Sequence, residues 1–231
     1  MFIAGNRWTP KEREDSLASF LLRRPGLKSL DIQDSRLFDI WPPTSPRIPL
    51  FQLQRLLCPA RIVSGIAARR LEFARLDWSN EEEPNAVAGD CRCTQAIVVA
   101  LKSMTQPYVP FIYAIEDCDP VFPELLASMS RNIAYTKTLH IYMDSNHHSR
   151  NEIISHFTNY LPRFTGLLFL WLDLRLVLGT KDTADQLTVQ GPGDVFSALA
   201  VCRLCFSAWR KVSGTWEKYP VDEFMALSGI D

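Results

Sequence analysis

Two pairs of side chains in this sequence have the chemistry to bind a metal ion. Cys91 and Cys93 are separated by one residue, and His147 and His148 are adjacent. A structural zinc site needs four ligands, usually supplied by pairs with C-x-x-C or H-x-x-x-H spacing. These two pairs have neither spacing, so we expect no metal ion and no cofactor. We expect Cys91 and Cys93 to lie at the start of a helix, and His147 and His148 to lie in a surface loop.

A second group of side chains could act in catalysis. Cys58 stands before Pro59 at the end of an apolar run, and Asp117 and Asp119 precede Pro120. A cysteine nucleophile needs a neighbouring base and an oxyanion hole, but no motif around Cys58 supplies them. The aspartates are explained by capping of the following helix. We therefore expect no enzymatic activity, and the alternative is an α/β hydrolase or transferase centred on Cys58 or on the aspartate pair.

The charge and the cysteine content restrict the partners and the compartment. The 25 Lys and Arg residues nearly balance the 26 Asp and Glu residues, whereas a nucleic-acid binder needs a clustered basic surface. The most apolar stretch, residues 167–178, contains charges and is shorter than the ~20 residues of a membrane-spanning helix. The cysteines show no disulfide framework, and the first residues show no secretory leader. We expect no nucleic acid and no membrane as partners, and a cytoplasmic or nuclear location.

A recurring leucine pattern predicts strands. Residues 27–32, 136–141 and 167–172 each fit the apolar positions of L-x-x-L-x-L-x-x-N, loosely at the first and last, and degenerate copies occur at 53–56, 71–73, 111–115 and 199–204. Alternate side chains of a strand point to opposite faces, so one side of each strand is apolar. The residues predicted to be buried are Leu30, Ile32, Leu139, Ile141, Leu170 and Leu172.

Helical segments are predicted between these strands. Their apolar spacing or capping residues place them at 16–24, 94–104, 120–131, after Ser149, from Asp194 to Val201, and after Asp222 as far as Gly229. This alternation predicts an α/β fold, a leucine-rich-repeat-like solenoid with irregular repeats. We expect a polar N-terminal segment at 1–15 and a single such domain at 16–231. A doubly wound sheet is the alternative, but no glycine-rich strand-to-helix turn supports it.

Three stretches of the sequence carry the pattern of a known family. The first two are Leu17-x-x-Phe20-Leu21-x-x-x-Pro25-x-Leu27-x-x-Leu30 and Leu53-x-x-Leu56-x-Cys58-Pro59. The third runs from Trp209 to Gly229 and contains Trp209 and Trp216 before a short predicted helix. Together these stretches resemble the fungal (mushroom-type) F-box/leucine-rich-repeat proteins, whose usual ending is a hairpin-like closure and a short final helix.

The resemblance implies a function in substrate recruitment. In that family an F-box docks a Skp-type adaptor of a cullin-RING ubiquitin ligase, and the repeats hold the target. We expect no F-box within this chain, because few residues precede Ser16 and they are mostly polar. We therefore expect a Skp-type adaptor as a partner only if an F-box is missing from the gene model.

The outward side chains of the predicted strands are the candidate binding residues. We expect a protein-binding repeat module, a substrate receptor of a ubiquitin ligase according to the resemblance, with an unknown protein as its partner. Aromatic and Arg side chains dominate the binding energy of many interfaces, which makes Trp171 the strongest candidate. The predicted partner-binding residues are Asp31, His140, Tyr142, Trp171, Asp173 and Arg175.

Overall fold

The computed structural model describes residues 17–32, 47–78, 91–104, 112–116, 122–143, 150–174, 199–204 and 207–228. A large sheet dominates this part of the chain, with the strand order β1-β3-β5-β6-β7-β8-β9-β10-β11. Neighbours from β1 to β9 are parallel, and β9, β10 and β11 are antiparallel. The strands are β1 (Ser29–Asp31), β3 (Arg55–Pro59), β5 (Phe73–Asp77), β6 (Ile112–Glu116), β7 (Thr138–Met143), β8 (Phe169–Leu174), β9 (Val201–Leu204), β10 (Ser207–Val212) and β11 (Thr215–Tyr219).

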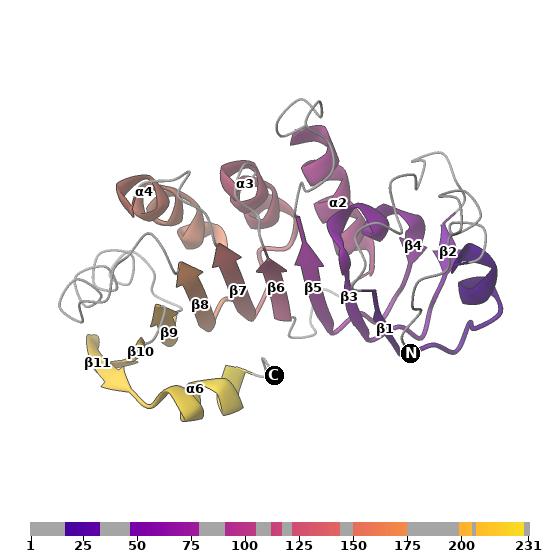
Figure 1. The fold of residues 1–231 in the computed structure, drawn as a ribbon. Coiled ribbons are helices and arrows are strands. Elements are labelled where there is room, and N and C mark those ends of the chain that lie inside the picture. Colours follow the sequence, from indigo (N-terminus) through magenta and orange to yellow (C-terminus); the bar gives the residue numbers. More distant parts are fainter. Residues whose placement is uncertain are drawn as a thin grey trace.

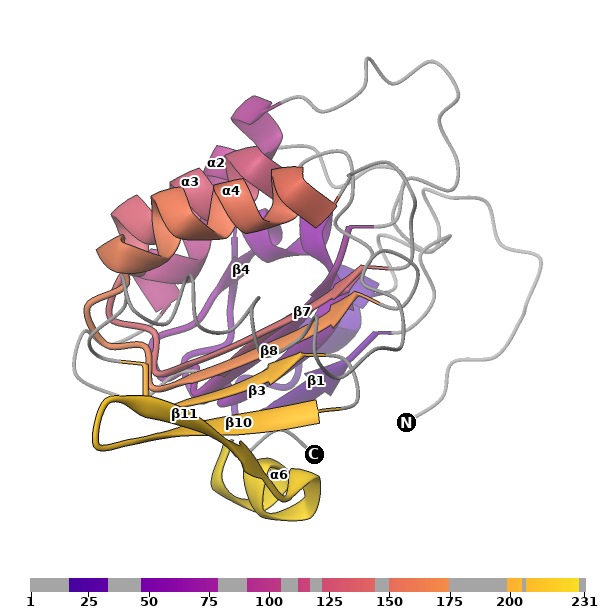
Figure 2. The ribbon, with the colours of Figure 1, turned by 90° about the vertical axis from the view of Figure 1, so that its left-hand side faces the viewer.

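The helices lie in two unequal layers on either side of the large sheet. Figures 1 and 2 show α2 (Cys91–Met104), α3 (Phe122–Asn132) and α4 (Arg150–Tyr160) over one face. The short helix α6 (Val221–Ser228) lies under the other face, near β9 and β10. The other described elements are two 3-10 turns, η2 (Ala60–Gly65) and η4 (Leu161–Arg163), and a small parallel sheet of β2 (Ile48–Pro49) and β4 (Ile66–Ala67). Residues 17–22 are helical too, within the helix predicted at 16–24.

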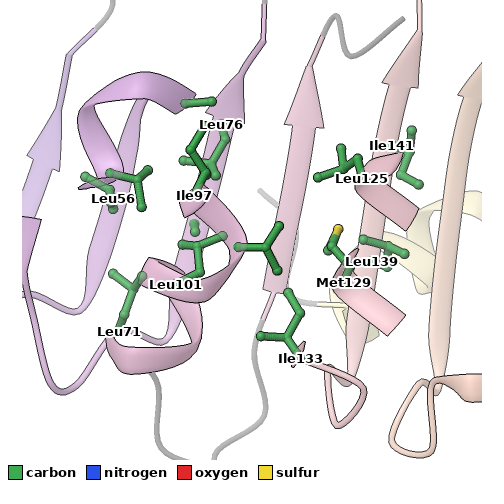
Figure 3. Packing of buried hydrophobic residues seen from close by; sticks show 14 of the residues in the cluster. Leu56, Leu71, Leu76, Ile97, Leu101, Leu125, Met129, Ile133, Leu139 and Ile141 are labelled. Atoms are coloured by element: carbon green, nitrogen blue, oxygen red, sulfur yellow. The ribbon is translucent and has the colours of Figure 1, made fainter. Parts of the chain in front are cut away.

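The core lies between the sheet and its helix layer. Figure 3 shows Ile97 and Leu101 of α2 directed toward Leu56 and Leu76 of the strands. Apolar residues spaced four apart on the helix therefore pack against alternate residues of the strands. All six residues predicted to be inside are buried: Leu30, Ile32, Leu139, Ile141, Leu170 and Leu172. Five of them lie in strands, and Ile32 follows the last residue of β1.

The predicted elements agree with the structure in most places. The strands expected from the leucine pattern are β1, β3, β5, β6, β7, β8 and β9, and the helices expected at 94–104, 120–131 and after Ser149 are α2, α3 and α4. The short last helix is α6. The helix expected from Asp194 to Val201 is wrong at its end, because Val201 begins β9 and residues 199–200 are not helical; residues 194–198 lie outside the described part.

The predicted fold class is wrong in its architecture. The described residues form an α/β fold around a mixed parallel and antiparallel sheet, and they do not form a leucine-rich-repeat-like solenoid. The sequence separation between register partners on neighbouring strands ranges from 18 residues (Leu56 to Ala74) to 39 (Ala74 to Tyr113). The sheet also ends in antiparallel strands, and α6 lies on its other face. Apolar alternation indicates a strand with one buried face, but it carries no information about whether the connections between strands repeat. A doubly wound sheet does not fit either, because strand order follows chain order with no switch point.

The hairpin expected around Trp209 and Trp216 is present as β10 and β11. Val212 pairs with Thr215, which leaves a two-residue loop of Ser213 and Gly214. Both loop residues have positive φ, 51° and 87°. This is the backbone that a tight hairpin requires to match the twist of its strands, and glycine adopts it without steric cost.

Leu170 offers a direct test of the core. Its side chain is 2% exposed and belongs to the main hydrophobic cluster, whereas Leu168, two residues earlier, is 36% exposed. Leu170→Ala should lower the free energy of unfolding by about 2–5 kcal/mol, because it leaves a cavity. Leu168→Ala should cost less than about 1 kcal/mol. Urea denaturation of both variants measures the difference, and equal losses would contradict this packing.

Gly166 is a second test, because it allows two chain segments to approach closely. Its N–H donates to the carbonyl of Ala134, 3.2 Å away, and an added Cβ would collide with the backbone of Tyr135. Gly166→Ala should therefore cost about 1–3 kcal/mol of stability. Gly26→Ala is the matched control, since an added Cβ there meets nothing within 4 Å. Thermal and urea unfolding should separate the two, and a neutral Gly166→Ala would show that the contact is absent.

Candidate functional site

The face of the sheet opposite α2, α3 and α4 carries the candidate site. We call it the open face. Strand pairing aligns one residue from each of seven neighbouring strands in a single row across it. From β1 to β9 this row consists of Asp31, Leu57, Arg75, Ala114, His140, Trp171 and Arg203.

Three planar side chains in this row form a continuous stack. The rings of His140 and Trp171 lie 3.8 Å apart between centroids and are nearly parallel, at 8°. The guanidinium carbon of Arg203 lies 4.1 Å from the centroid of Trp171, within the range of a cation–π interaction. Neighbouring strands are about 4.8 Å apart, so flat side chains at the same register position can stack across them. The stack therefore follows from residue type and register together.

A second cation–π pair lies one row away, on the strands toward β1. Arg55 and Phe73 are register partners on β3 and β5, and the guanidinium carbon of Arg55 is 4.6 Å from the ring centroid. Phe73 is buried but lies outside the main core cluster, as expected for a residue on the open face. Arginine side chains thus cover aromatic surface at two places on this face.

Helix α6 covers the other end of the open face. Phe224 is fully buried and meets the rings of Phe169 and Trp171 edge-on, at 6.4 and 6.3 Å between centroids. It forms a small separate cluster with Val201 and Ala208. Trp171 is consequently half-buried, under α6 on one side and between His140 and Arg203 on the others.

His140 is the titratable group most affected by this site. The pKa of its imidazole is lowered from 6.5 to about 3, chiefly by burial and also by the nearby positive charges of Arg75 and Arg203. Both ring nitrogens are buried without a hydrogen-bond partner in the part of the chain that the structure describes. The imidazole is therefore neutral near pH 7, and such a low pKa makes it a weak base.

The predicted partner-binding residues differ in their exposure. Asp31 is exposed at the edge strand β1, whereas His140, Tyr142 and Trp171 are half-buried in the middle of the open face. Asp173 is buried and is the register partner of Tyr142. Arg175 lies outside the described residues. The structure therefore brings the His140–Trp171 pair close to the Tyr142–Asp173 pair and places Asp31 far along the sheet from both.

Two residues that shape this face, Arg75 and Arg203, are absent from the predicted binding residues. Both lie on strands that were predicted, so the alternation of Phe73–Asp77 and Val201–Leu204 contained the signal. Each arginine stands between two buried residues in its strand. Applying the period-two rule to these degenerate copies would have placed both arginines on the outward side.

The cysteines do not form a reactive or metal-binding centre among the described residues. Burial raises the pKa of the Cys58 thiol well above its usual range and that of Cys202 to about 12, which disfavours the reactive thiolate. The expectation that no pair has C-x-x-C spacing is wrong, because Cys202 and Cys205 have it, but Cys205 is outside the described part. Within that part, no three His, Cys, Asp or Glu side chains could hold one metal ion. The side chains of Cys91 and Cys93, and the residues Asp117, Asp119, His147 and His148, also lie outside it.

Comparisons with known proteins found no match, whether with protein-family models, curated proteins or solved structures. No helix in the described ranges is long and apolar enough to span a membrane. The candidate site therefore rests on the geometry of the open face.

The low pKa of His140 predicts a specific dependence of stability on pH. Below pH 6.5 the unfolded chain binds a proton at His140 that the folded chain does not bind until about pH 3. The free energy of unfolding should therefore fall with decreasing pH across this window. The loss due to His140 should be about 2 kcal/mol between pH 7 and pH 5. His140→Phe removes this group and keeps a flat ring against Trp171. Urea denaturation at both pH values should show a smaller loss for His140→Phe than for the wild type, and equal losses would contradict the burial of this imidazole.

Proposed function

We propose that this chain is a non-enzymatic protein-binding domain and that the open face is its recognition surface. The observation that carries the proposal is the row containing Arg75, His140, Trp171 and Arg203, together with Tyr142 beside it. Arg, Tyr and Trp are enriched among the residues that dominate binding energy at protein interfaces.

Partial burial favours a binding function for these side chains. Arg75, His140, Tyr142, Trp171 and Arg203 are each half-buried. Stacking on neighbours holds His140, Trp171 and Arg203 in place, so these three side chains lose less rotational freedom when a partner binds. Such preorganisation increases affinity, because ordering a flexible side chain at an interface costs about 0.5–1.5 kcal/mol.

The distribution of charge supports a protein as the partner. Arg55, Arg75 and Arg203 share the open face with Asp31 and Asp77, and the whole chain has a net charge of −1. A nucleic-acid surface would be uniformly basic, because phosphate binding depends on neutralising a line of negative charges. Interspersed charges of both signs favour a partner that carries both signs too.

The chemistry of the described residues favours binding over catalysis. His140 is a weak base at neutral pH, and Cys58 is buried with a raised pKa. General acid–base catalysis works best with a pKa near the operating pH, and nucleophilic cysteine catalysis requires a thiolate. Neither group meets its requirement.

The identity of the partner is a finer proposal that depends on the sequence resemblance. Residues 17–30 and 53–59 resemble fungal F-box/leucine-rich-repeat proteins, whose partners are targets of a cullin-RING ubiquitin ligase. By that resemblance the open face would hold a ligase target, and this chain would be a substrate receptor. The binding proposal itself depends only on the residues of the face.

The proposal is tested by affinity capture with variants of the open face. Arg75→Ala and Tyr142→Ala remove half-buried side chains that are outside the small α6 cluster. Each should reduce recovery of the specific partner at least about tenfold, equivalent to about 1.4 kcal/mol. Partners captured by the wild-type full chain are quantified by mass spectrometry and confirmed by titration with the purified partner.

Arg131→Ala is the matched control, since Arg131 is an exposed arginine on α3, in the helix layer. It should leave partner recovery unchanged. Circular dichroism melts of all variants separate loss of binding from loss of folding. Full retention of the same partner by both open-face variants would contradict the proposed surface. Trp171→Ala is a poor first test, because the contacts of Trp171 with His140, Arg203 and Phe224 make it stabilising as well as outward-facing.

A further inference from the structure

We infer that the β7–β9 end of the open face is a docking site for a short amphipathic helix, that α6 is its resident occupant, and that a helix of the partner protein replaces α6 there. This inference rests on the proposed function and specifies the kind of partner element. It also implies that the chain blocks part of its own binding surface until that helix arrives.

Helix α6 contacts the sheet through one stripe of residues. Val221, Phe224, Met225 and Ser228 are buried or half-buried, and their spacing is i, i+3, i+4, i+7. This is the anchor pattern by which amphipathic helices bind surface grooves in other proteins. On the opposite side Leu227 is 58% exposed, so α6 lies on the face and is not enclosed by it.

Each anchor meets a specific group on the sheet. Phe224 packs edge-on against Phe169 and Trp171. The sulfur of Met225 lies 3.0 Å from the Nη1 atom of Arg203, which donates to it. One turn later, the Thr138 hydroxyl donates to the backbone carbonyl of Ser228 over 3.3 Å. A partner helix that fits would present an aromatic residue, a flexible apolar residue beside it, and a small residue one turn on.

The packing of α6 is separate from the main core. Phe224 belongs to a small cluster with Val201 and Ala208, and no α6 residue belongs to the large cluster between the sheet and α2, α3 and α4. Helix α6 follows the last strand, β11, after Pro220 alone. It can therefore leave the face without breaking a strand pair, and segments with few core contacts open at lower free energy than the whole fold.

Removal of α6 would uncover side chains suited to an interface. Trp171, Phe169 and Arg203 would lose their cover, and Trp171 would remain oriented by its stack on His140. Trp and Arg in an oriented, partly desolvated setting are the residues most often found as binding hot spots. The site would then be continuous with the part of the open face that carries Arg75.

The test uses a fluorescein-labelled peptide of residues 220–231 as the probe and the full chain as the receptor. In the full chain, Phe224→Ala weakens docking of the chain's own α6. The labelled peptide should bind this variant, measured by fluorescence anisotropy. It should bind the wild-type chain at least about tenfold more weakly, because tethered α6 competes at an effective concentration on the order of millimolar.

Two peptide variants test the anchor pattern. A peptide with Phe224→Ala should lose binding, and a peptide with Leu227→Ala should bind like the unchanged peptide, since Leu227 points away from the sheet. Absence of peptide binding to the folded Phe224→Ala chain would overturn the inference. Equal binding to the wild-type chain and to this variant would overturn it too.

Hydrogen exchange on the wild-type chain gives an independent result if Phe224→Ala does not fold. Amides of α6 should exchange through a local opening, at least about tenfold faster than those of the central strand β7 (Thr138–Met143). Equal protection with the same denaturant dependence would mean that α6 opens only on global unfolding, which would overturn the inference. Failure here would leave the Arg75 and Tyr142 test unaffected, so the two proposals can fail separately.

Discussion

A parallel sheet must have both of its faces covered, and the rest of this structure depends on how the chain meets that requirement. Parallel strands buried on both faces are the rule, because their crossover connections place helices against them. Here α2, α3 and α4 cover one face and form a continuous apolar core with it. Among the described residues, α6 is the helix that lies on the other face, at one end, and side chains elsewhere on that face pack against one another.

Side chains on the open face shield one another from solvent by stacking. Arg203, Trp171 and His140 lie one above another across three strands, and Arg55 lies over Phe73 on two others. These contacts shield aromatic surface with groups that still carry charge or hydrogen-bonding capacity. Burial of His140 in this stack lowers its pKa, and the positive charges of Arg75 and Arg203 act in the same direction. One arrangement thus covers aromatic surface and holds Arg, Trp and His side chains in fixed orientations on this face.

The outcome of sequence reasoning differed between elements for physical reasons. Alternation is a local property, so burial of Leu139, Ile141, Leu170 and Leu172 and the outward direction of Trp171 could be predicted from single strands. The α6 helix was predicted from its cap and its final glycine, but its position was not, because nothing in Val221–Ser228 specifies which face it contacts. Arg75 and Arg203 were missed because their strands matched the leucine pattern poorly.

The sequence by itself determined most of the helices and strands and which side of each strand is apolar, since side-chain alternation and capping depend on neighbours within a few residues. It also determined which residue types would lie on the open face. Only the tertiary structure decided the register that aligns His140 with Trp171 and Arg203, and the placement of α6 over Phe169 and Trp171. The tertiary structure also set the strand order, in which connections of unequal length join neighbouring strands of one mixed sheet. These features depend on contacts between residues far apart in the chain, whose free energies no local pattern records.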